Sequence, residues 1–188
     1  MFTPEQISHI TSVKQKLREF HESCCDQLWG AIVSGYYRNS PFISGGAIAS
    51  LLQGETPNDY DYYFGIPPFS DVVKWSETYS DHIMDSVEYY RLQGGNPDPS
   101  DTGTPLVSEN AITMRNTAQI IYRLHGTPSE IKSTFDYVHC TPHYDVVDDT
   151  LYISKQQYDC CVNKMLVINN KDRVTSHRRE KFKKRGYI

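Results

Sequence analysis

The sequence has no long hydrophobic run and few hydrophobic residues overall. Of its 188 residues, 38% are hydrophobic, and no apolar stretch approaches the ~20 residues that a membrane-spanning helix needs. The first residues, from Met1 to Glu5, lack the basic and then apolar pattern of a secretory signal peptide. We therefore expect a cytoplasmic chain that has no membrane partner.

Cysteine is scarce, and its spacing does not suit metal binding. The five cysteines form two adjacent pairs, Cys24-Cys25 and Cys160-Cys161, and a single Cys140. Side chains of adjacent residues point in different directions, so they rarely bind one tetrahedral metal ion together. The pattern argues against a zinc site and indicates reduced thiols in a cytosolic compartment, packed as small buried hydrophobes.

Tyrosine, in contrast, is abundant. The chain has 14 tyrosines, and each can bury its ring while the hydroxyl keeps a polar contact. A hydrophobic core can therefore form, and a chain that is disordered throughout is excluded. The length suits one domain with at most a small appendage. We expect a body at residues 1–170 and a basic C-terminal helix within residues 171–188, packed on that body.

Charge is distributed unevenly along the chain. The net charge is −4, from 19 Lys+Arg and 23 Asp+Glu. Residues 171–188 hold eight basic and two acidic side chains, a balance of +6, which leaves −10 for the first 170 residues. An acidic body joined to a basic tail points to an anionic partner.

Local patterns predict a succession of helices and strands. Thr3-Pro4-Glu5 has the capping threonine, the proline and the acidic residue that begin a helix, and apolar residues at three- or four-residue spacing continue it to Gly30 or Gly35. Further helices are expected at residues 47–52, 70–90, from 127, 155–164 and 172–185, strands at 42–43, 59–64, 111–114, 118–122, 135–140 and 151–153, and a loop at 93–104. This order implies an α+β fold, a mixed β-sheet with flanking helices.

One segment combines a glycine pair with two closely spaced acids. The short apolar strand Phe42-Ile43 leads into Ser44-Gly45-Gly46, then a helix, and then Asp59-Tyr60-Asp61. Residues at i and i+2 of a strand share a face, so Asp59 and Asp61 would present their carboxylates side by side. Such carboxylates repel each other, and a divalent cation bridging them, usually Mg²⁺, relieves the repulsion.

The glycine pair adds a phosphate site to this metal site. Glycine lets the chain turn tightly, and backbone N–H groups at a helix N-terminus attract phosphate. Gly45 and Gly46, with Ser44 just before them, are therefore candidates for contact with phosphate. Together with the two acids they describe a site for a metal-bound nucleoside triphosphate.

A two-metal transfer reaction also needs a third acid. The candidate is Asp136 in Phe-Asp-Tyr-Val, because apolar neighbours on the expected strand 135–140 would anchor it in the sheet. Asp145, in Tyr-Asp-Val-Val, is the second candidate. Asp148 and Asp149 follow it closely, which favours a loop at that point.

The basic tail is a second functional clue. Arg178, Arg179 and Lys181 are candidates for contact with nucleic acid or with the incoming triphosphate. The alternative is a solvated terminal helix whose charge has no function. Phe182 lies at helical spacing from Arg178 and Arg185, which predicts that the helix docks on the body and brings its charges near the acids.

The glycine pair, followed after twelve residues by Asp-x-Asp, resembles the signature of the DNA polymerase β-like nucleotidyltransferase superfamily. The spacing is closest to that of tRNA CCA-adding enzymes and bacterial poly(A) polymerases, and Leu51-Leu52-Gln53-Gly54 matches the end of their motif helix. Where that family has Val-Arg-Asp, this chain has Ile48-Ala49-Ser50. In its small size the chain also looks like small nucleotidyltransferase-like proteins of bacteriophages.

The resemblance implies a reaction and a role for each residue. Asp59, Asp61 and Asp136 would hold two Mg²⁺ ions, with Mn²⁺ as the alternative, while Gly45 and Gly46 would hold the triphosphate. A hydroxyl of an RNA (tRNA included), a protein or a small molecule would attack the α-phosphorus and release pyrophosphate. The second hypothesis is a non-catalytic module of this fold that binds nucleotide or RNA, or that inhibits a partner protein.

Overall fold

The computed structural model describes residues 1–32, 41–65, 106–107, 111–113 and 117–188. The helix expected at residues 70–90 and the loop expected at 93–104 lie outside these ranges. None of the helices in the described part of the chain is both long and apolar enough to cross a membrane.

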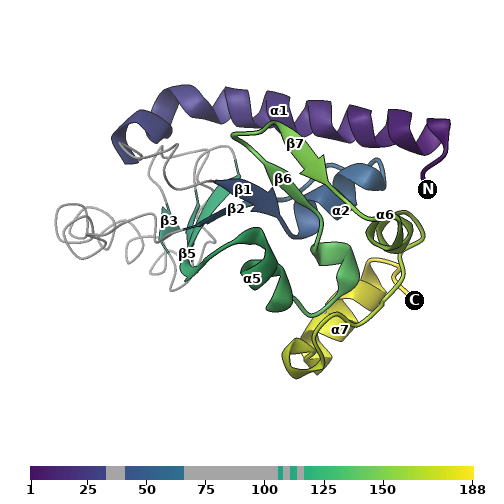
Figure 1. Ribbon diagram of the computed structural model, residues 1–188. Helices are drawn as coiled ribbons and strands as arrows, with labels where there is room; N and C mark the ends of the chain where they lie inside the picture. Colours follow the sequence, from purple (N-terminus) through teal and green to yellow (C-terminus); the bar gives the residue numbers. More distant parts are fainter. Residues whose placement is uncertain (33–40, 66–105, 108–110, 114–116) are drawn as a thin grey trace.

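Within the described ranges, seven strands form one mixed sheet in the order β3-β4-β5-β2-β1-β6-β7 (Figure 1). The strands are β1 Phe42–Ser44, β2 Tyr60–Phe64, β3 Leu106–Val107, β4 Ala111–Thr113, β5 Ala118–His125, β6 His143–Asp145 and β7 Thr150–Tyr152. β2 and β5 are parallel, and the other neighbouring strands are antiparallel. The predicted α+β fold with a mixed sheet is confirmed.

The helices begin where the sequence supplies capping groups. The Thr3 hydroxyl accepts from Gln6 N–H at 3.3 Å, and Gln6 Oε1 accepts from Thr3 N–H at 3.1 Å. Thr127 and Glu130 form the same reciprocal cap, which satisfies backbone N–H groups that the first turn leaves free. The helices are α1 Pro4–Ile32, α2 Gly46–Leu52, α5 Pro128–Ser133, α6 Lys155–Val162 and α7 Ser176–Lys184, with 3-10 turns η2 Val138–Cys140 and η3 Lys171–Arg173.

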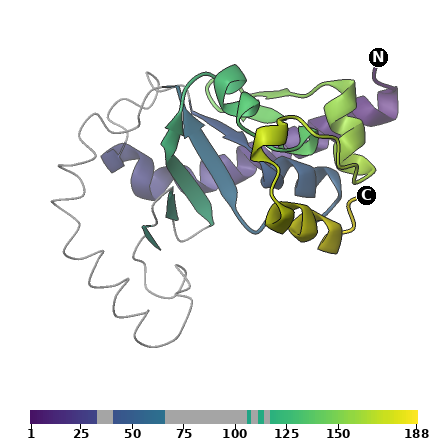
Figure 2. The same ribbon diagram turned by 90° about the horizontal axis from the view of Figure 1, so that it is seen from below.

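The sheet separates two layers of helices. Figures 1 and 2 show α1 along one face, and α5 and α7 on the opposite side. Along β2, Tyr60, Tyr62 and Phe64 enter the main core, which they share with α1 and α2. Tyr63 packs in a second cluster on the other face, together with Ile131 of α5. Because side chains alternate along a strand, Asp61 shares the face of Tyr63.

The strand predicted at residues 135–140 is wrong. After Tyr137 the chain turns into η2, because Cys140 N–H donates to Tyr137 O at 3.1 Å and Thr141 N–H donates to Val138 O at 3.0 Å. The apolar alternation that suggested a strand instead buries Tyr137 and Cys140 against Phe182 of α7. Asp136 therefore lies outside the sheet.

The described cysteines are buried, and the C-terminal segment buries two aromatic side chains. The four cysteines whose side chains the structure describes (Cys24, Cys140, Cys160 and Cys161) are buried. Phe182 and Tyr187 are each 4% exposed and pack against Tyr137 and Cys140 in a third cluster. These aromatic contacts hold α7 against the body and so decide where its charged residues lie.

Candidate functional site

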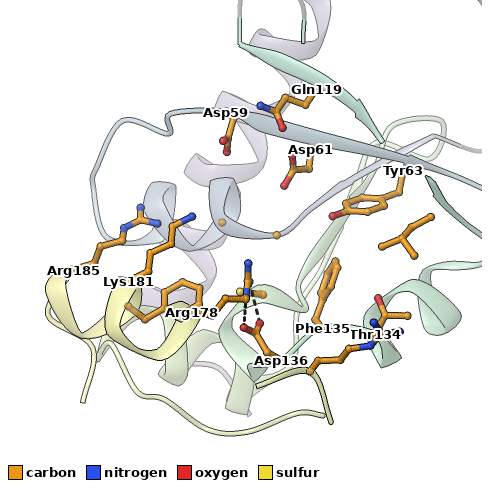
Figure 3. Close-up of a pocket in the computed structure, with 16 residues that line it drawn as sticks. Asp59, Asp61, Tyr63, Gln119, Thr134, Phe135, Asp136, Arg178, Lys181 and Arg185 are labelled. Atoms are coloured by element: carbon orange, nitrogen blue, oxygen red, sulfur yellow. Dashed lines mark hydrogen bonds and ion pairs between the residues drawn. The ribbon is translucent and has the colours of Figure 1, made fainter. Parts of the chain in front are cut away.

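A pocket of about 450 Å³ lies between the acid-bearing face of β2 and helix α7 (Figure 3). Three groups of lining residues define it. We call Gly45, Gly46, Asp59, Asp61 and Gln119 the acidic wall, Arg173, Arg178, Lys181 and Arg185 the basic wall, and Tyr63, Leu124, Thr134 and Phe135 the apolar end.

The acidic wall is built by strand register. Asp61 is the second residue of β2, opposite Ser44 on β1 and Gln119 on β5. Gly45 adopts φ +93°, and a Cβ at this position would lie 3.2 Å from Asp61 Oδ2. A non-glycine residue is therefore disfavoured at position 45 both by its backbone conformation and by the carboxylate packed over it.

The two acids of this wall are electrostatically strained. Burial raises the pKa of Asp61 to about 7, and the neighbouring Asp59 charge adds to that rise, while Lys181 and Arg178 oppose it. A cation shared by the two carboxylates would relieve this cost. The oxygen donors of Asp59, Asp61 and the Gln119 amide are the kind that Mg²⁺ prefers, so the residues present fit a magnesium ion.

The third predicted acid lies away from this pair. Asp136 is 2% exposed, and its carboxylate accepts from Arg178 Nε and, at 3.1 Å, from Arg178 Nη2. In the part of the chain that the structure describes, no three His, Cys, Asp or Glu side chains gather closely enough to hold a metal ion. Asp145, the second candidate, accepts from the N–H groups of Val147 and Asp148 at 2.9 Å in the turn after β6.

The three residues predicted to contact phosphate, Ser44, Gly45 and Gly46, differ in their access to the pocket. Ser44 is fully buried, donates to Pro142 O at 2.7 Å and does not line the pocket. Gly45 N–H donates to Cys140 O at 3.1 Å, so this donor is already used. Gly46 lines the pocket, and a Cβ there would have no atom of the described residues within 4 Å. Of these three residues, Gly46 is the one with free space before it.

The basic wall contains two of the three predicted cationic residues. Arg178 and Lys181 line the pocket, whereas Arg179 is exposed and is not among the lining residues. Arg185 and Arg173 complete the wall and were missed from the sequence. Helical periodicity could have found Arg185, because positions 178, 181 and 185 follow one face of a helix. No sequence signal indicated Arg173, which lies in η3.

Contacts with the helix that follows the glycine pair fix the basic wall in place. Gln53 Nε2 donates to the Tyr187 hydroxyl at 2.7 Å, and Arg185 Nη2 donates to Ser50 Oγ at 3.1 Å. Ser50 belongs to α2 and Gln53 directly follows it. The two walls are therefore joined through α2, and the width of the pocket is set by the fold.

The apolar end lies away from two of the cationic residues, Lys181 and Arg185 (Figure 3). In Figure 3, Thr134 and Phe135 lie on the side of the pocket opposite Lys181 and Arg185. The rings of Tyr63 and Phe135 meet edge to face, with centroids 5.7 Å apart. The pocket thus suits an elongated ligand that has an anionic end and a flat apolar end.

The sequence matches the family model described as Gad2, Gabija anti-defense 2 family protein, over residues 11–164. The chain belongs to the Gad2 family. The matched range contains the acidic wall and Asp136 but stops before the basic wall. No curated protein matches this Gad2-family chain.

Among solved structures, the Gad2-family chain is similar to CCA-adding enzymes. It shares 11% identity with the Thermotoga maritima CCA-adding enzyme complexed with tRNA, over 86% of this chain and 36% of that one, at a TM-score of 0.48. A CCA-adding enzyme complexed with CTP gives 12% identity over 90% of this chain and 33% of that one, at a TM-score of 0.44. The chain spans about a third of the length of these enzymes.

Proposed function

We propose that this Gad2-family chain binds a metal-complexed nucleoside triphosphate in the pocket and transfers its nucleoside monophosphate to an acceptor hydroxyl, and that this reaction counters the Gabija defence. One observation carries the proposal: the carboxylates of Asp61 in β2 and of Asp59, which directly precedes β2, line the same pocket as four cationic side chains. A metal-bound polyphosphate has the charge distribution that this arrangement complements.

Each part of the pocket has a role in this reaction. Asp59 and Asp61 would hold Mg²⁺, which, when bound, offsets the negative charge that develops around the α-phosphate. Lys181 and Arg185 bind the phosphates beyond it, so that the leaving pyrophosphate is stabilised by fixed positive charge. The nucleobase lies at the apolar end, against Phe135.

The acceptor is proposed from the family description. The hydroxyl belongs to an RNA, a protein or a small molecule, and the name of the family directs the first search to the components of the Gabija defence. Modification of such a component would need only catalytic amounts of the chain, because one molecule can modify many targets in turn.

A second function is favoured by the incomplete set of acids. Gln119 occupies the β5 position beside Asp61. Asp136 lines the pocket but is paired with Arg178, so among the described lining residues two carboxylates, rather than three, are left to bind a metal ion. A site of this kind can bind a nucleotide without transferring it. In this second proposal the chain inhibits a partner by binding alone.

The test measures pyrophosphate release and the transfer of label from each nucleoside triphosphate in Mg²⁺. The variants are Asp59→Asn and Asp61→Asn, and Asp148→Asn is the matched control because it changes an exposed acid outside the pocket. We expect release and transfer by the native chain and by the control, and background levels for the two pocket variants.

The outcomes separate the two functions. Nucleotide binding without pyrophosphate release, whatever acceptor is offered, would support the binding module and reject the transferase. Transfer that is undiminished in both pocket variants would reject this pocket as the active site. In cells that carry the Gabija defence, we expect the native chain to suppress it and Asp61→Asn to fail, while retained suppression would indicate inhibition by binding.

A further inference from the structure

We propose that Asp136 is a positioning residue that holds Arg178 in the pocket, and that the basic wall so formed selects ligands with a triphosphate tail over ligands with a single phosphate. The proposal deepens the proposed function, on which it rests for the class of ligand. It assigns Asp136 to phosphate recognition rather than to metal binding.

The carboxylate of Asp136 is held on both of its oxygens. Oδ1 accepts from Tyr137 N–H at 3.0 Å and from Arg178 Nη2 at 3.1 Å, while Oδ2 accepts from Arg178 Nε. The main chain is fixed as well, because Asp136 O accepts from the N–H groups of Asn169 at 2.8 Å and Asn170 at 3.2 Å. A buried carboxylate satisfied in this way is a strong anchor for a cation and has little capacity left for a metal ion.

The anchored cation keeps its other end open to the pocket. The Arg178 side chain is 43% exposed, whereas that of Asp136 is 2% exposed. Asp136 engages Nε and Nη2, so the Nη1 group has no hydrogen-bond partner within the described part of the chain. Figure 3 shows Arg178 reaching up from Asp136 into the pocket. The guanidinium of Arg178 also lies over the Phe182 ring, 5.5 Å from its centroid, which limits its movement further.

The charge of the wall matches several phosphates. The wall has four cationic side chains, and Asp136 offsets one of them. The remaining positive charge exceeds that of one phosphate group and suits a polyphosphate tail, which presents several anionic oxygens in a row. Because Asp136 already holds Nε and Nη2 of the Arg178 guanidinium, the side chain loses little conformational freedom when it binds a phosphate.

The experiment measures binding of inorganic tripolyphosphate and of inorganic phosphate by calorimetry, in EDTA. Without a divalent cation, a loss of binding in Asp136→Asn cannot come from the loss of a metal ligand, and removal of a negative charge alone would favour anion binding. We expect Asp136→Asn and Arg178→Gln each to weaken tripolyphosphate binding by about tenfold or more, the scale of a charge-assisted hydrogen bond. Phosphate binding should change by less than about threefold. Arg179→Gln is the matched control on the same helix, and we expect it to bind both probes like the native chain.

A double variant shows whether Asp136 acts through Arg178. If it does, Asp136→Asn has no further effect on tripolyphosphate binding in the Arg178→Gln background. Independent, additive losses would overturn the positioning role, and so would native binding by Asp136→Asn. If Asp136→Asn does not fold, as judged by circular dichroism, then Arg178→Lys decides the matter. This variant keeps the positive charge but loses the two-point hydrogen bonding of the guanidinium to Asp136. It should weaken the binding of tripolyphosphate more than that of phosphate, and native binding of both would contradict the proposal.

Failure of this inference and failure of the transferase proposal give different results. A chain that binds tripolyphosphate through Asp136 and Arg178 but releases no pyrophosphate supports the basic wall and rejects transfer. A chain that releases pyrophosphate while the native protein shows no preference for tripolyphosphate over phosphate supports transfer and overturns the inference.

Discussion

The acidic and basic walls of the pocket are held in place by different kinds of contact. The acidic wall is fixed mainly by backbone pairing, because β1 and β2 are in register from Ser44–Asp61 to Phe42–Tyr63. The basic wall is fixed by side chains, through the burial of Phe182 and the pairing of Arg178 with Asp136. One wall therefore depends on local sheet geometry and the other on packing between distant segments.

The two walls also differ in how their charges are compensated. Asp59 and Asp61 lie side by side (Figure 3), neither forms an ion pair with a described residue, and burial raises the pKa of Asp61 to about 7. On the basic wall, the Asp136 carboxylate raises the pKa of Arg178 above its ordinary value, so its charge is secured. The acidic wall thus gains from a bound cation, while Arg178 is already stabilised before any ligand arrives.

The largest effect is expected from removing Phe182, the aromatic side chain that anchors α7 and with it the basic wall. Phe182→Ala deletes a ring that contacts Tyr137, His139 and Tyr187, and we expect a loss of about 3–5 kcal/mol in the free energy of unfolding. Chemical denaturation measures it. Val162→Ala, at a partly exposed position of α6, should cost less than about 0.5 kcal/mol. A small effect of Phe182→Ala would show that the basic wall does not depend on side-chain packing.

Substitutions in the glycine pair test whether the backbone conformation fixes the acidic wall. Gly45→Ala places a Cβ 3.2 Å from Asp61 Oδ2 at a φ of +93°, and we expect a destabilisation of about 3 kcal/mol. The methyl group of Gly46→Ala would meet no atom of the described residues within 4 Å. This variant should therefore fold with native stability, while its methyl group occupies ligand space and weakens nucleotide binding. Equal effects of the two changes on stability would contradict this account.

The pH dependence of stability should report the strain between the acids. Asp61 has a folded-state pKa of about 7 against an ordinary value of 3.8, so the unfolded chain loses this proton first. The stability that the protonated Asp61 side chain gives to the folded state is fully present below pH 4 and is lost as the pH rises through 7. Without metal, Asp61→Asn should be more stable than the native chain at pH 8 by on the order of a few kcal/mol, and this difference should be small at pH 4. Chemical denaturation of both proteins at pH 4 and pH 8 measures this difference. No gain for Asp61→Asn, or a loss, would show that the two acids are not strained in the folded chain.

The smallest effect is expected on the outer face of α7. Arg179 is exposed and does not line the pocket, so Arg179→Ala should change the free energy of unfolding by less than about 0.5 kcal/mol. Nucleotide affinity should change by less than about threefold, since the charge is screened by solvent. A large loss of affinity would show that the functional cationic surface extends beyond the basic wall.

The sequence predicted the elements around the two acids well because their structure is local. The strand, helix and second strand expected between residues 42 and 64 are present as β1, α2 and β2. Asp61 lies in β2 and Asp59 directly precedes it. Caps at Thr3 and Thr127 were also correctly predicted. These features depend on neighbouring residues, and spacing alone reports them.

The misjudged features depend on contacts between distant segments. Asp136 was assigned to a strand because its neighbours are apolar, but those neighbours are buried by α7, which follows some forty residues later. Its carboxylate pairs with Arg178, and no spacing rule connects the two. Gln119 beside Asp61 follows from the parallel register of β2 and β5, which the sequence does not disclose.

The docking of α7 has a consequence for protein synthesis. Translation proceeds from the N-terminus, so the strands that carry Asp59 and Asp61 emerge from the ribosome well before residues 173–185. A nascent chain at that stage has the carboxylates without the cations that face them. Under the proposed function, the pocket would bind a polyphosphate only after the C-terminal helix has been made and packed, so a partly translated chain would not yet bind it.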